Sequence, residues 1–226
     1  MGRGSGGTKG GPSGSSKPWV TLVPQKGMSF AGASSKWKNA KELSSIKDKA
    51  VYNEVMDGIA KFNAIFGMSN DQKNIMLGRL DKWTAGTAYS YANGKFKGIL
   101  LNQTVFNKPL AEVVKTRQYA YSIGYSVRTS HPAQHTVVHE LGHSLWNGKW
   151  TTSTEKVKMQ NLFNDFRKAY PTTAARKKAG WGDYAASKVN EFFAEGIAKH
   201  ILGKPDKYTK AIMEVAKAQD KNLKKK

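Results

Sequence analysis

His139-Glu140-Leu141-Gly142-His143 is the stretch of the sequence that decides most about the fold and its chemistry. A helix is expected to carry it, beginning after Pro132 and reaching about Trp146. Residues four apart share one face of a helix, so His139 and His143 can present two imidazoles to one metal ion. Glu140 lies one residue round, where its carboxylate reaches a water on the metal rather than the metal itself. The H-E-x-x-H pattern therefore predicts two zinc ligands and one general base.

A catalytic zinc site also needs a third protein ligand and keeps one position open. The chain has no Cys, so the third ligand must be a His, an Asp or a Glu. The extension that gives metzincins their third His is absent, because Trp146 and Lys149 stand at its Gly and His positions. The residues alone leave four downstream candidates open, and they are Asp183, Glu191, Glu195 and His200.

One segment narrows the choice among these four candidates. It reads Tyr184-Ala185-Ala186-Ser187-Lys188-Val189-Asn190-Glu191-Phe192-Phe193-Ala194-Glu195. It resembles the downstream helix of gluzincin metallopeptidases of the anthrax-lethal-factor type, in which a Tyr and six further residues precede Glu-Phe-Phe-Ala-Glu. Related zincin-like domains of phage and toxin proteins carry the same segment. The resemblance runs from His139 to Gly203, and residues 1–85 resemble no family.

The resemblance implies a role for each matching residue. Glu191 would be the third ligand of a Zn²⁺ cofactor, with Glu195 as its main rival. Glu195 would otherwise hold a ligating imidazole in place. Tyr184 would stabilise the oxyanion or protonate the leaving amine. A peptide or protein would be the substrate, although the same chemistry would hydrolyse a non-peptide amide.

In zincins the substrate lies extended along the edge strand of the sheet beside the site. The strand Gly98-Ile99-Leu100-Leu101-Asn102 is therefore the one that we expect to pair with the peptide backbone. Two other His residues need separate treatment. His135 precedes His139 by four residues, but a helical stripe drifts about 40° in that interval, so we expect His135 beside the site or on the surface. His200 is expected to interact with the C-terminal dipole of its helix.

The remaining periodicities predict an α+β, zincin-like fold, mostly helical with a small, largely antiparallel sheet. Asn93-Gly94 predicts a hairpin turn. Helices are expected over residues 42–66, 71–83, 109–117, 132–146, 152–170, 187–202 and from 206 onward, with strands over 98–102 and 119–128 and a link over 174–182. The domain organisation expected is a flexible, basic Gly/Ser-rich tail (1–17), an extended segment with helices (18–85), the zincin-like metallopeptidase domain (86–218) and a Lys-rich tail (219–226).

The charge balance raises a second class of function. Lys and Arg number 37 against 16 Asp and Glu, a net charge of +21. Such a chain attracts polyanions, so non-specific nucleic acid is a further candidate partner, although a solvated Lys-rich surface would give the same count. The alternatives are thus a zinc metallopeptidase, as a phage- or toxin-associated effector, and a basic virion or nucleic-acid-associated structural protein with a structural or vestigial zinc domain. Glu140 favours the enzyme, because a purely structural site needs no carboxylate beside its ligands.

Targeting signals are not found in the sequence. It has no apolar run of membrane-spanning length and no signal-peptide pattern at its start, so we expect no membrane partner. The localisation stays unknown, and a virion or a host cytoplasm is a candidate.

Overall fold

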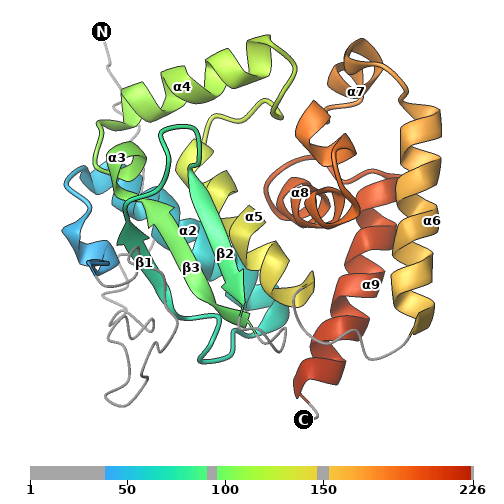
Figure 1. Ribbon diagram of the computed structural model, residues 1–226, viewed down its shortest axis with the longest axis horizontal. Coiled ribbons are helices and arrows are strands. Elements are labelled where there is room, and N and C mark those ends of the chain that lie inside the picture. Colours follow the sequence, from blue (N-terminus) through green and yellow to red (C-terminus); the bar gives the residue numbers. More distant parts are fainter. Residues whose placement is uncertain (1–38, 91–95, 147–152, 225–226) are drawn as a thin grey trace, which may run out of the picture.

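The computed structural model describes residues 39–90, 96–146 and 153–224. The described chain is mostly helical with a three-stranded mixed sheet, consistent with the expected α+β class (Figure 1). Several expectations lie outside the described residues. They are the tail over 1–17, residues 18–38 of the segment after it, the turn at Asn93-Gly94, the helix start at Thr152 and the last two residues of the Lys-rich tail.

In chain order the elements are the 3₁₀ turn η1 (Leu43–Ser45), α2 (Lys49–Phe66), β1 (Ile75–Gly78), β2 (Gly86–Ser90), β3 (Phe96–Asn102), α3 (Gln103–Phe106), α4 (Leu110–Ser122), α5 (Pro132–Trp146), α6 (Ser153–Ala169), α7 (Thr173–Lys178), the 3₁₀ turn η2 (Asp183–Ala186), α8 (Val189–Leu202) and α9 (Lys207–Lys224). Helix α5 runs through the middle of the molecule. The sheet and α2 lie on one side of it, and α6, α8 and α9 lie on the other (Figure 1).

The sheet has the strand order β1-β3-β2. Strand β3 is parallel to β1 and antiparallel to β2, so the sheet is mixed rather than largely antiparallel. The expectation that Gly98–Asn102 is an edge strand is wrong, because β3 is central and both of its sides are paired. The strand at the edge beside α5 is β2.

The predicted helix over residues 71–83 is also wrong, because β1 lies there. Ile75 and Leu77 face the main core, whereas Met76 packs with Leu100 on the other face of the sheet. Side chains that alternate between two faces are typical of a strand. Pairing with β3 therefore overrides the helical spacing of the apolar residues, as tertiary contacts commonly do.

The predicted strand over residues 119–128 is wrong, because α4 continues to Ser122 and no regular strand lies between it and α5. Gly124, with φ 82°, adopts the left-handed conformation at which helices commonly end.

Three other boundaries differ from expectation. Helix α2 begins at Lys49 rather than residue 42, because the Asp48 carboxylate caps it by accepting hydrogen bonds from the Ala50 and Val51 amides. The expected link over 174–182 contains most of α7. Helix α8 has Lys188 at its N-cap rather than Ser187, whose hydroxyl donates to the carbonyl of Tyr184 instead.

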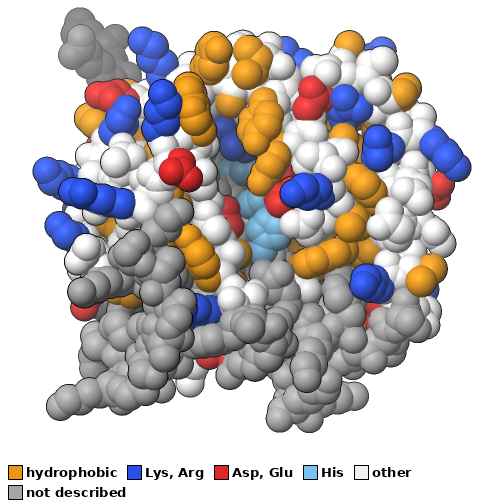
Figure 2. All heavy atoms as spheres, viewed as in Figure 1, with side chains coloured by type: hydrophobic (Ala, Val, Ile, Leu, Met, Phe, Trp, Pro, Cys, Tyr) orange, Lys and Arg blue, Asp and Glu red, His pale blue; other side chains and the backbone are white. Residues whose placement is uncertain are grey.

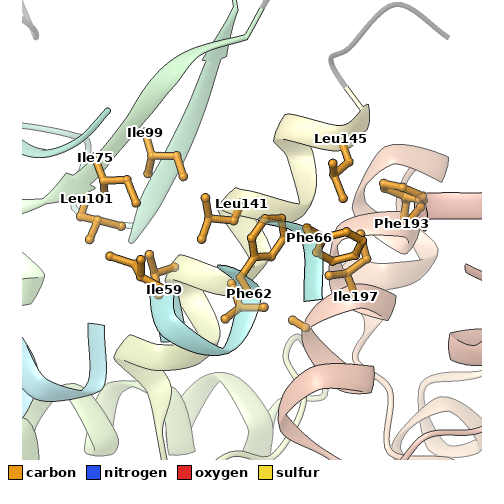
Figure 3. Packing of buried hydrophobic residues seen from close by; sticks show 14 of the residues in the cluster. Ile59, Phe62, Phe66, Ile75, Ile99, Leu101, Leu141, Leu145, Phe193 and Ile197 are labelled. Carbon is orange, nitrogen blue, oxygen red and sulfur yellow. The ribbon is translucent and has the colours of Figure 1, made fainter. Parts of the chain in front are cut away.

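The core surrounds α5 on several sides, and nearly all of its residues are buried. Leu141 and Leu145 lie among Phe62 and Phe66 of α2 and Phe193 of α8 (Figure 3). Burying one such side chain contributes roughly 1.5–3 kcal/mol to the free energy of folding. Helix α5 is therefore held firmly from both sides, and residues 39–85 share one core with the segment expected to form the zincin-like domain.

Candidate metal centre

The site forms where α5 and α8 approach each other closely. A Cβ atom on Gly142 would lie 3.0 Å from the Cα of Ala194, so the missing side chain permits this approach. As a result, Glu191 and Glu195, one turn apart on α8, face the histidines of α5.

Three side-chain atoms converge at this junction. Glu191 Oε2 lies 3.2 Å from His139 Nε2 and 3.1 Å from His143 Nε2, and the two imidazole nitrogens are 3.1 Å apart. A tetrahedral zinc ion with bonds of 2.0–2.1 Å would hold its ligand atoms roughly 3.3 Å apart. Without a cation or protons between them, three such acceptor atoms would repel one another. The donor set therefore fits a metal ion, and His139, His143 and Glu191 form the group that could hold one among the described residues.

Asp183 and His200, two other candidates for the third ligand, make different contacts. Asp183 accepts a 2.6 Å hydrogen bond from Arg176 Nε. His200 lies in the last turn of α8, as expected for a residue near the helix dipole, and burial lowers its pKa.

Glu195 lies behind the metal-binding group rather than in it. Its Oε1 is 3.2 Å from His139 Nδ1, and its Oε2 is 3.3 Å from His135 Nε2. Both are ion-pair distances, although their angles depart from those of good hydrogen bonds. This position agrees with the expected role of Glu195 in holding a ligating imidazole. His135 is buried beside the site and not on the surface, and it is not among the three converging residues.

The ionisation states of Glu191 and His139 favour the binding of a cation between them. Burial alone would lower the pKa of His139, but hydrogen bonds to Glu191 and Glu195 outweigh it and raise this pKa to about 10. Burial alone would raise the pKa of Glu191, but hydrogen bonds from His139 and His143 hold it well below its usual range. Glu191 therefore stays anionic, and His139 carries a proton that a metal ion would displace.

Glu140 is buried on the side of the site that faces β2. Burial raises the pKa of its carboxyl, although the charges of His139 and His143 oppose the shift. A Cβ atom on Gly86, at the start of β2, would lie only 2.8 Å from Glu140 Cγ. The bare backbone of Gly86 thus leaves the space that this carboxylate occupies.

Tyr184 closes the site from η2. Its ring centroid lies 5.7 Å from that of His139 and 5.2 Å from that of Tyr125. The Tyr184 amide donates a 3.0 Å hydrogen bond to the carbonyl of Tyr125, which fixes η2 against the segment after α4. Burial, together with the charge and hydrogen bonding of Glu191, raises the pKa of the Tyr184 phenol. The phenol is therefore a hydrogen-bond donor at neutral pH.

His139, Glu140, Tyr184 and Glu195 line one cleft of about 170 Å³. Figure 2 shows histidine side chains at the bottom of a groove between the two halves of the molecule. Trp83 and Tyr125, which are 84% and 51% exposed, also line the cleft. Three larger cavities, of about 640, 670 and 450 Å³, lie elsewhere, and none of them is lined by His139, His143 or Glu191.

Sequence reasoning missed several residues of this cleft, namely Trp83, Gly86, Arg117 and Tyr125. Gly86 had a signal, because a Gly opening a strand is typical of a close approach by another group. Arg117 and Tyr125 had none, because only the tertiary fold brings them to α5. The expected substrate strand over Gly98–Asn102 does not line the cleft, whereas the edge strand β2 does through Gly86.

A scan against models of protein families and comparisons with curated proteins and solved structures find no match. Among the helices of the described residues, none has the length and apolarity needed to cross a membrane.

Proposed function

We propose that this protein is a zinc-dependent metallopeptidase, with zinc held by His139, His143 and Glu191. One observation carries the proposal. Three side-chain atoms from two helices converge within 3.2 Å of one another, and a buried carboxylate, that of Glu140, lies beside His139 in the cleft. A structural zinc site is normally closed by four protein ligands, whereas three ligands and an adjacent base are typical of a hydrolase.

The chain's own residues would divide the reaction among them. When bound, zinc supplies a Lewis acid that polarises the substrate carbonyl and acidifies a neighbouring water. Glu140 accepts the proton of the attacking water and passes it to the departing amine, and its raised pKa brings it closer to the ideal for this exchange. Tyr184 donates a hydrogen bond to the developing oxyanion, a contribution of about 3 kcal/mol in such sites.

The substrate would add to the sheet at β2. This strand pairs with β3 on one side, and no strand of the described residues pairs with its other side. Gly86 lies at the cleft, so a peptide extended along β2 would pass Glu140. This assignment replaces β3, the strand over Gly98–Asn102, as the candidate for binding substrate backbone.

The basic surface supports a second candidate, a virion or nucleic-acid-associated role. Beyond the net charge of +21, a cavity of about 640 Å³ is lined by Arg167, Lys168 and Arg176. Retention of the protein on immobilised DNA should then fall steeply as salt rises, whereas a slope near zero would remove this candidate. A packaged, ejected effector would combine both functions.

A peptide-library digest tests the peptidase. The metal-free protein should be inactive, zinc should restore cleavage, and a chelator should abolish it again. Glu140→Gln tests the general base, because it keeps the shape of the side chain but removes the base. This variant should bind zinc normally and cleave about 10²- to 10⁴-fold more slowly. Equal cleavage by Glu140→Gln and the parent would refute the mechanism.

A further inference from the structure

Arg117 of α4 reaches behind the metal centre. Its Nη2 lies 2.9 Å from His135 Nδ1, so the group that it meets is an imidazole rather than a carboxylate. Its Nε is buried and has no hydrogen-bond partner among the described residues. Burying a guanidinium in this way is costly, which calls for a compensating role.

The contact fixes where His135 carries its proton. A guanidinium offers only donors and stays protonated, so Nδ1 of His135 must be the acceptor. An imidazole that accepts at one ring nitrogen is neutral, and burial, which lowers the pKa of His135, acts in the same direction. A neutral ring that accepts at Nδ1 has its proton on Nε2, the nitrogen that faces Glu195 Oε2 at 3.3 Å.

Glu195 links this arrangement of protons to the metal centre. A carboxylate only accepts, and Oε1 of Glu195 lies 3.2 Å from His139 Nδ1. The proton of His139 that remains after metal binding is therefore held on Nδ1. Its Nε2 faces Glu191 Oε2 and would be left free to ligate the metal.

We propose that Arg117 is a positioning residue, which acts through His135 and Glu195 to keep His139 Nε2 available as the metal ligand. Without Arg117, the His135 ring can place its proton on Nδ1 and turn a lone pair toward Glu195, which then loses a donor. The effect on the metal rests on the proposed zinc centre. The tautomer of His135 does not, because it is a property of the metal-free protein.

Three variants of the full-length chain separate this role from a general effect of charge or packing. Arg117→Met keeps the length of the stem and removes the donor. Arg117→Lys keeps a donor and the charge. Lys115→Met removes a positive charge from an exposed position of the same helix and is the matched control.

The first readout is ¹⁵N NMR of the His135 ring in metal-free protein at neutral pH. The parent should show the Nε2–H tautomer, Arg117→Met should show a mixture or the other tautomer, and Arg117→Lys should resemble the parent. The second readout is the zinc dissociation constant from chelator competition. It should rise about tenfold or more in Arg117→Met and change less than twofold in Lys115→Met.

A parent His135 with its proton on Nδ1 would overturn the proposal. So would a folded Arg117→Met protein whose tautomer and zinc affinity match the parent. If Arg117→Met does not fold, the parent tautomer and Arg117→Lys decide the question. A parent that binds no zinc would refute the proposed metal centre, while the NMR readout would still support or overturn the role of Arg117 in fixing His135.

Discussion

His143 Nε2 lies 3.1 Å from Glu191 Oε2, although 48 positions separate the two residues in the sequence. The contact exists because α5 and α8 pack closely at Gly142 and Ala194. Two of the three proposed ligands are thus brought together by a local helical spacing, and the third is brought to them by tertiary packing. Substitutions of residues around the site should therefore differ in effect, some changing metal binding and others changing catalysis.

Tyr184→Phe should slow peptide cleavage while leaving zinc content unchanged. The phenol is protonated at neutral pH and, in the proposed mechanism, donates to the oxyanion, so its loss should lower kcat by about 10²- to 10³-fold with a small effect on KM. Steady-state kinetics on one library-derived peptide would measure this. Tyr119→Phe, at an exposed position of α4, is the control and should match the parent. A kcat of Tyr184→Phe equal to the parent's would remove the phenol from the mechanism.

Gly86→Ala should misplace the general base without unfolding the protein. Gly86 has no unusual backbone angle, but its new Cβ would stand 2.8 Å from Glu140 Cγ, so the carboxylate has to move. A displacement of this kind costs about 10²-fold in rate. Cleavage rate, zinc content and melting temperature should be measured together. Thr87→Ala changes the next residue, whose side chain alternates to the opposite face of β2, and should be close to neutral. Full activity in Gly86→Ala would show that Glu140 is not positioned by β2.

Zinc uptake at neutral pH should release a proton. The pKa of His139 is raised to about 10 in the metal-free protein, so the protonated ring competes with zinc below that pH. Zinc affinity should therefore increase as pH rises toward 10, by up to about tenfold per unit. The same shift stabilises the metal-free fold below the ordinary pKa of 6.5, and this stabilisation is lost as pH rises through 10. Calorimetry in two buffers of different ionisation enthalpy counts the proton. No released proton and a flat affinity between about pH 6 and 8 would contradict the assignment.

Glu54→Ala should destabilise the fold through the start of α5. The buried Glu54 carboxylate accepts a 3.1 Å hydrogen bond from the Ala133 amide and lies 3.1 Å from His131 Nδ1. Removing it leaves a buried amide without its acceptor, at a cost of about 1–3 kcal/mol in the free energy of unfolding. Urea titration of the metal-free chain would measure the loss. Asp57→Ala, at an exposed position of α2, should shift the midpoint little, and equal midpoints for both variants would refute the role of Glu54.

The sequence predicted those parts of the site that depend on local geometry. The helix over 132–146 follows from a regular period, and the convergence of His139 and His143 follows from their spacing of four. Glu191 was reached through the resemblance of its segment, and the structure brings it to the two histidines.

The parts that sequence reasoning missed depend on contacts between distant elements. Strand β1 has only four residues, too few for a period to distinguish it from a helix, and its pairing with β3 decides its form. The central position of β3 could not be predicted once β1 had been read as a helix. Arg117 and His135 lie on different helices, and no pattern in the sequence of either helix predicts their contact.

The zinc content of the reconstituted full-length chain tests the metal centre most directly. Metal-free parent, Glu191→Ala and Asp183→Ala proteins would each be incubated with zinc, freed of excess ion and analysed by mass spectrometry. The parent and Asp183→Ala should hold about one zinc ion per chain, and Glu191→Ala should hold less than about a tenth of that, because among the described residues Glu191 is the one that completes the proposed ligand set. A parent that retains no zinc, or a folded Glu191→Ala protein that retains a full equivalent, would contradict the proposed site.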